Sequence, residues 1–170
     1  MVLARVFPRK TRATPDDELA FVGPPPERYT QMALTGQIPQ IDEVHISVAF
    51  TYDLPKAEDL ARQWERIAPV KIGGPAFNTP GGDFVPGQYL KPGFVITSRG
   101  CPNRCWFCSV PRREGYRIRE LPVENGWNVL DDNLLACSER HIRQVFDMLS
   151  RQEQTPVFSG GLEARLLQPW

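Results

Sequence analysis

The chain has 170 residues, of which 20 are basic and 20 are acidic, so its formal net charge at pH 7 is zero. That length allows one domain or two small ones, and a hydrophobic content of 41% excludes a disordered chain. Neutrality argues against binding nucleic acid by broad attraction to phosphate, and no run of about 18 apolar residues predicts a membrane span. Because no apolar leader is visible, we expect a cytoplasmic protein.

The first part of the chain predicts a small βαβ region. Leu3–Phe7 is a candidate strand, and apolar and polar residues roughly alternate over Val44–Phe50, as they do in a half-buried strand. Apolar residues then recur every three or four positions over Pro55–Ala68, which predicts a helix, and Pro69–Ile72 resumes a strand. A strand, a helix and a second strand within about 30 residues indicate the α/β class.

A segment rich in glycine and proline, residues 75–92, predicts a linker or a lid loop. We therefore expect an N-terminal α/β region over residues 1–90, which includes this linker, and a second region over residues 91–170. Three further strands are predicted in the second region, at Phe94–Thr97, Trp127–Leu130 and Pro156–Phe158.

A helix is predicted over Glu139–Arg151, and Ser138 can cap its first turn. His141 lies in that turn, and we expect it to face solvent. The loop Pro111–Arg119 contains four arginines and a tyrosine, a composition that can contact a polyanion such as RNA. We favour a solvated loop for this segment, and we likewise expect Arg99, farther upstream, to be a surface loop arginine.

Three of the four cysteines, Cys101, Cys105 and Cys108, fall within eight residues with the spacing C-x3-C-x2-C. Thiolates this close can converge on one metal centre, and they suit zinc or an iron–sulfur cluster. Three cysteines would leave one iron of a four-iron cluster open to a cofactor. The alternatives are three buried apolar side chains, or a zinc site completed by Cys137 or His141. We favour the open cluster, because the second cysteine pair of a structural zinc site is missing.

The segment Thr97–Cys108 resembles the signature of the radical S-adenosylmethionine (radical SAM) enzymes, with Phe107 in its aromatic position and a predicted strand before it. Its lead-in, Ser98–Pro102, is most similar to the branch that contains methylthiotransferases and cobalamin-associated radical enzymes. The resemblance implies a partial (β/α) TIM-like barrel, of which this chain would hold about the first three strands. Since each βα unit takes about 30 residues, we expect either a C-terminally truncated enzyme or a chain that pairs with a complementing one.

The resemblance also implies roles for particular residues. Cys101, Cys105 and Cys108 would hold a 4Fe–4S cluster, S-adenosylmethionine would chelate the fourth iron, and Phe107 would lie against the adenine. An electron from a donor such as a flavodoxin or ferredoxin would cleave S-adenosylmethionine to a 5′-deoxyadenosyl radical, which would abstract hydrogen from an unidentified substrate. The alternative function is a non-catalytic iron–sulfur or zinc-binding module.

Family members also carry a Gly-Gly-Glu-like segment, at the end of the second barrel strand, that contacts the methionine amino group. Ser159–Glu163 resembles its letters more, but belongs to the third predicted strand. By position, this chain would use Asp131, Asp132 and Asn133, with Gly160 and Gly161 as a wall of the same pocket. The alternatives are a solvated loop or the lead-in to a helix for the two aspartates, and an ordinary turn for the two glycines.

Overall fold

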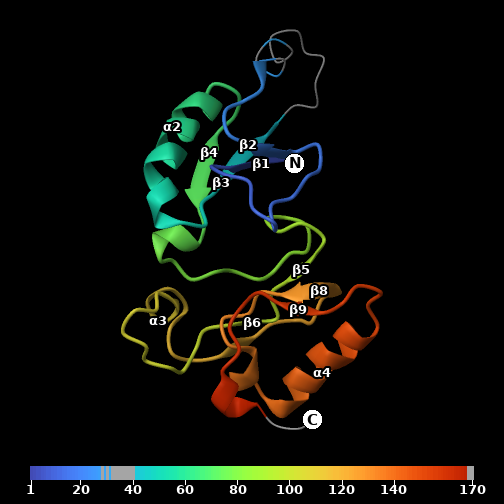
Figure 1. Ribbon diagram of the computed structural model, residues 1–170. Helices are drawn as coiled ribbons and strands as arrows, with labels where there is room; N and C mark the ends of the chain where they lie inside the picture. Colours follow the sequence, from blue (N-terminus) through green and yellow to red (C-terminus); the bar gives the residue numbers. More distant parts are fainter. Residues whose placement is uncertain (28, 30, 32–40, 168–170) are drawn as a thin grey trace. The chain divides into compact units, whose positions relative to one another are not determined.

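The computed structural model describes residues 1–27, 29, 31 and 41–167 of the chain. The chain divides into two compact units, Met1–Phe77 and Asn78–Trp170 (Figure 1). Both units combine helices with parallel sheet, so the fold is of the mixed α/β kind. Within the described residues, no helix is both long enough and apolar enough to cross a membrane.

The first unit is built on a four-stranded parallel sheet with the order β2-β1-β3-β4. Its strands are β1 (Leu3–Phe7), β2 (Ala20–Val22), β3 (Glu43–Ser47) and β4 (Val70–Gly73). Three of them lie where the sequence predicts strands. The short β2 was not predicted, because three residues are too few to show the alternation that identifies a strand.

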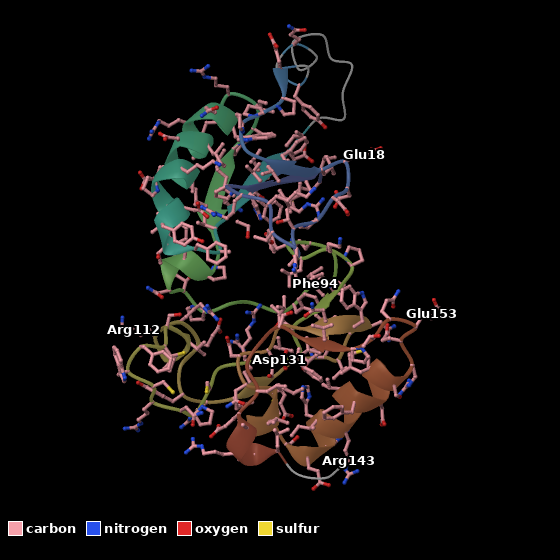
Figure 2. The ribbon with its side chains drawn as sticks, viewed as in Figure 1. Glu18, Phe94, Arg112, Asp131, Arg143 and Glu153 are labelled. Carbon is pink, nitrogen blue, oxygen red and sulfur yellow. The ribbon has the colours of Figure 1, made fainter. Side chains whose placement is uncertain are left out.

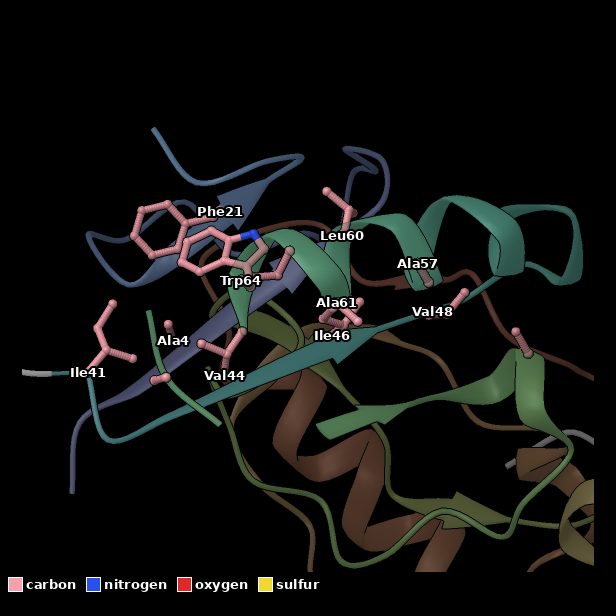
Figure 3. Packing of buried hydrophobic residues seen from close by; sticks show 13 residues of the cluster. Ala4, Phe21, Ile41, Val44, Ile46, Val48, Ala57, Leu60, Ala61 and Trp64 are labelled. Atoms are coloured by element: carbon pink, nitrogen blue, oxygen red, sulfur yellow. The ribbon is translucent and has the colours of Figure 1, made fainter. Parts of the chain in front are cut away.

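Helix α2 (Leu54–Trp64) connects β3 to β4 and completes the predicted βαβ unit. Pro55 lies in its first turn, where a missing N–H costs nothing, and Trp64 ends it four residues before the predicted end. Trp64 is fully buried, its ring centroid is 5.0 Å from that of Phe21, and its indole Nε1 donates to the carbonyl of Gly23 at 3.1 Å (Figure 3). The helix thus packs on one face of the sheet.

The second unit contains a three-stranded parallel sheet in the sequential order β5-β8-β9. Its strands are β5 (Gly93–Val95), β8 (Gly126–Val129) and β9 (Val157–Phe158). Each lies at or beside a predicted strand. Helix α4 (Glu139–Ser150) connects β8 to β9, and its buried residues, such as Val145, pack in one cluster with Val95 and Val129. The predicted cap is confirmed, because Ser138 Oγ accepts a hydrogen bond from the backbone N–H of His141 at 3.2 Å.

The chain between β5 and β8 folds back on itself. A two-residue strand, β6 (Ser98–Arg99), pairs antiparallel with β7 (Arg119–Glu120). Between them lie the cysteine loop and a short helix, α3 (Val110–Glu114). The cysteine loop is therefore closed at its base by two strands.

Part of the segment predicted as a linker is hydrogen-bonded inside the second unit. The backbone N–H of Gly81 donates to both carboxylate oxygens of Glu114, at 3.1 and 3.2 Å. The carbonyl of Gly82 accepts from Arg99 Nε at 3.1 Å. These contacts give residues 81–82, in the middle of this segment, a fixed place against α3 and β6.

Candidate functional site

The three clustered cysteines lie on the loop between β6 and α3. All are free thiols; Cys105 is exposed, and Cys101 and Cys108 are half-buried. Phe107, between the second and third cysteine, has 74% of its surface exposed. Among the described residues, no group of three or more Cys, His, Asp or Glu side chains is gathered closely enough to hold a metal ion. The thiols therefore share one loop without meeting at one point.

The loop begins at a position that only glycine can occupy. Gly100 has φ of 89°, and a Cβ there would lie 2.2 Å from the carbonyl oxygen of Arg117. Its backbone N–H donates to Asp132 Oδ2 at 2.9 Å. The glycine before Cys101 thus sets the direction in which the cysteine loop leaves β6.

Asp131, the first residue of the predicted cofactor segment, is buried inside the second unit with an exposed fraction of 1% (Figure 2). Its Oδ1 accepts from the backbone N–H of Thr97 at 2.6 Å, and its Oδ2 accepts from the hydroxyls of Thr97 and Ser98 at 2.6 and 2.7 Å. The alternative that Asp131 lies in a solvated loop is therefore wrong. The carboxylate ties the end of β8 to the chain that leads into the cysteine loop.

Asp132 belongs to a network of charged residues beside α3. Arg113 donates to Asp132 Oδ1 at 2.9 Å and to Glu114 Oε1 at 3.0 Å, and the Glu114 side chain is only 1% exposed. Burial raises the pKa of Asp132, while the Gly100 N–H and the Arg113 charge oppose this shift. The alternative of a solvated loop is wrong for Asp132 as well, because its carboxylate is held between the Gly100 N–H and the Arg113 guanidinium.

Two arginines expected to be solvated also lie in this network. The side chains of Arg99 and Arg113 are each 16% exposed, and Arg99 Nη1 is 3.6 Å from Glu114 Oε1. The pKa of Arg99 is lowered by burial, which the charges of Glu114 and Asp132 oppose. The expectation holds for Arg112, a member of the Pro111–Arg119 loop, which is exposed (Figure 2).

Asn133 connects the end of β8 to a cysteine. It is 3% exposed, and its Nδ2 donates to Cys101 Sγ at 3.4 Å and to Glu163 Oε2 at 3.1 Å. The same Glu163 oxygen accepts from Asn103 Nδ2, on the cysteine loop, at 2.8 Å. The hydrogen bond from Asn103 lowers the pKa of Glu163 the most, and the bond from Asn133 lowers it further. Asn133 Oδ1 is buried and has no hydrogen-bond partner.

Glu163 and Asn103 were not among the predicted site residues. Glu163 lies two residues beyond Gly161, so the similarity of Ser159–Glu163 to a Gly-Gly-Glu segment was a usable signal for it. Asn103 gave no such signal, because a polar residue between two cysteines is an ordinary loop residue.

Gly160 and Gly161 follow β9 and pack directly on the chain after β8. A Cβ on Gly160 would lie 2.2 Å from the carbonyl oxygen of Asp131, and one on Gly161 would lie 2.0 Å from that of Asp132. The N–H of Gly161 donates to the carbonyl of Asp131 at 2.7 Å. An ordinary turn does not account for this close approach, which brings the ends of two neighbouring strands together.

His141 is buried, so the expectation that it faces solvent is wrong. It is 4% exposed, and its Nε2 lies 3.3 Å from the hydroxyl of Thr97. His141 lies four residues before Val145 and therefore on the packed face of α4, and the prediction overlooked this spacing.

Cys137 is half-buried. Burial raises its pKa to about 11, and a hydrogen bond with Ser98 opposes this shift.

The described part of unit 2 thus gathers the predicted residues 131–133 and 160–161 around the base of the cysteine loop. No family model matches this chain, and neither curated proteins nor solved structures give a significant match to it. The function of the chain therefore has to be argued from the chemistry of these residues.

Proposed function

We propose that this chain is a radical SAM protein in which Cys101, Cys105 and Cys108 hold a 4Fe–4S cluster and S-adenosylmethionine chelates the fourth iron. The observation that carries the proposal is the position of three free thiols on one loop, at the C-x3-C-x2-C spacing, where the ends of parallel strands meet. The sequential parallel order β5-β8-β9 is also what the first units of a (β/α) barrel require.

The chemistry of the donor set fits the cluster. Thiolates are the usual ligands of iron–sulfur clusters, and three of them leave one iron open. Metal sites with ligands on one loop commonly assemble as the metal binds, so thiols that are apart beforehand are compatible with a shared centre. The loop from Gly100 to Ser109 contains no helix or strand that would have to break for the thiols to gather.

Two further features fit S-adenosylmethionine. A buried acceptor without a partner is costly, and Asn133 Oδ1 is such an acceptor, suited to the amino group of a bound ligand. The exposed ring of Phe107 lies on the same loop and is available to stack on adenine.

When bound, the reduced cluster and S-adenosylmethionine supply the radical that abstracts hydrogen from an organic substrate. The remaining work belongs to the chain's own residues. Asp131 and Asp132 hold the start of the cysteine loop, through Thr97 and Gly100. The amide of Asn133 donates to the sulfur of Cys101. The electron would come from a small redox protein such as a flavodoxin or ferredoxin.

The test is anaerobic reconstitution with iron and sulfide. We expect a brown protein with the absorption and, after reduction, the electron paramagnetic resonance (EPR) signal of a 4Fe–4S cluster, which changes when S-adenosylmethionine is added. Dithionite-reduced protein should then form 5′-deoxyadenosine. Cys105→Ser should lose the cluster, whereas Cys137→Ser, the matched control, should keep it. A colourless protein that holds one tight zinc would contradict the proposal, and a cluster without 5′-deoxyadenosine would indicate the non-catalytic module.

A further inference from the structure

The amide of Asn133 lies between two acceptors, a carboxylate and a sulfur. Its Nδ2 is 3.1 Å from Glu163 Oε2 and 3.4 Å from Cys101 Sγ, and the side chain is buried. An amide NH2 has two protons, so one proton is available for each acceptor.

The chemistry of Glu163 decides which way this amide faces. An ionised carboxylate can only accept hydrogen bonds, so it requires the NH2 group of Asn133 rather than its carbonyl oxygen. Asn103 presents its own NH2 to the same oxygen at 2.8 Å, for the same reason. If the side-chain amide of Asn133 were flipped, its carbonyl oxygen would face both the carboxylate and the sulfur, and neither a carboxylate nor a thiolate could donate a hydrogen bond to it. The orientation therefore follows from the partners.

The bonds to Glu163 also fix where Cys101 can lie. Asn103 is two residues beyond Cys101 on the same loop, and Glu163 follows β9. One carboxylate oxygen thus holds the loop through Asn103 and, through Asn133, aims an N–H at the sulfur of Cys101.

We propose that Asn133, oriented by Glu163, is a positioning residue that donates an N–H···S hydrogen bond to the Cys101 thiolate and thereby raises the reduction potential of the cluster. This inference rests on the proposed function. Hydrogen bonds to the sulfurs are one of the features that set the potential of an iron–sulfur cluster. A donor stabilises the reduced cluster more than the oxidised one, because the reduced cluster carries more negative charge on its sulfurs.

The test is an anaerobic redox titration followed by EPR on reconstituted wild-type protein and variants. Asn133→Ala should shift the midpoint potential to a more negative value. Asn125→Ala, the same substitution at an exposed asparagine before β8, should leave it unchanged. An unchanged potential in a cluster-containing Asn133→Ala protein would overturn the inference and leave the proposed function intact.

Two variants of Glu163 test whether this residue orients the Asn133 amide or only stabilises the fold. They also test the inference if Asn133→Ala does not fold. Glu163→Gln retains a carbonyl oxygen that can accept from Asn133, so its potential should stay near that of the wild type. Glu163→Ala removes the acceptor and should shift the potential in the negative direction. Equal potentials in the two variants would overturn the role assigned to Glu163.

A second readout needs no cluster. In the apo protein, the amide of Asn133 donates to the half-buried sulfur of Cys101, so Asn133→Ala should change the rate at which Cys101 is alkylated, measured by peptide mass spectrometry. Cys105, which is exposed, should be alkylated at the wild-type rate and is the internal control. An unchanged Cys101 rate would overturn the contact itself. Wild-type protein that takes up no cluster would instead overturn the proposed function.

Discussion

The carboxylate of Asp131 and the residue Thr97 are joined by two hydrogen bonds of 2.6 Å, one to the backbone N–H and one to the hydroxyl. Both residues are buried, and they lie 34 positions apart in the chain. Since Thr97 lies two residues beyond the end of β5 and Asp131 lies two residues beyond the end of β8, this pair joins the ends of neighbouring parallel strands at the base of the cysteine loop.

We expect Asp131→Asn to lower the free energy of unfolding by about 1–3 kcal/mol, because the amide NH2 would face a donor and leave a buried group unsatisfied. Urea denaturation followed by circular dichroism measures the change. Asp147→Asn makes the same change at an exposed position on α4 and should stay within about 0.5 kcal/mol of wild type. Equal stabilities for the two variants would show that the Asp131–Thr97 pair contributes nothing.

The contact between strand ends gives a second prediction. Gly160→Ala places a methyl group against the backbone of Asp131, which has no flexible end to move, and should destabilise the protein by about 1–3 kcal/mol. Gly82→Ala is the matched control, because no atom lies within 4 Å of a Cβ built there. Thermal unfolding of both variants measures the difference. A Gly160→Ala protein as stable as Gly82→Ala would mean that the two strand ends are farther apart than described.

The thiols should differ in reactivity. Burial raises the pKa of Cys137 to about 11, so at pH 8 this residue is almost entirely the unreactive neutral thiol, and its reaction should speed up only as the pH approaches 11. Ellman's reagent at pH 8 should therefore modify the three clustered cysteines of the apo protein first.

Two serine variants check the assignment of the slow thiol. Cys105→Ser should reduce the number of fast-reacting thiols by one, whereas Cys137→Ser should leave that number unchanged. Loss of a fast-reacting thiol in Cys137→Ser would contradict the buried, neutral state of this residue.

The first unit should lose stability in acid through one ion pair. Arg9 donates to both oxygens of Asp53 at 2.6 and 2.7 Å, and this bonding lowers the pKa of Asp53 against the effect of burial. A lowered pKa means that the folded state holds the proton less tightly than the unfolded state. The stabilisation that the Arg9–Asp53 ion pair contributes is therefore complete above the pKa of about 3.9 that an aspartate has in the unfolded chain. It is lost as the pH falls through the lower pKa that Asp53 has in the folded protein.

Comparison of urea midpoints at pH 7 and pH 3 tests this pair. The acid-induced decrease should be smaller for Asp53→Asn than for wild type, because an asparagine has no proton to gain. Asp59→Asn, at an exposed position on α2, should retain the wild-type decrease. If Asp53→Asn lost as much stability in acid as the wild type, the ion pair would not be the cause.

The sequence by itself determined the local elements and the chemical character of the loop. The βαβ unit of the first region, the strands near Phe94 and Trp127 and the helix capped by Ser138 all follow from side-chain periodicity and capping, which act over a few residues. The spacing of the three cysteines is likewise a property of one short segment, and it carries the proposal of a cluster.

Only the tertiary structure decided which polar groups are buried and what they bond. Asn133 meets Cys101 across 32 positions, and Asn103 meets Glu163 across 60. His141 and Arg99 were expected at the surface, yet each is covered and bonded by a segment that is distant in sequence. The physical reason is that burial and hydrogen-bond partners depend on which strand ends become neighbours in the sheet, and periodicity within one segment does not specify that.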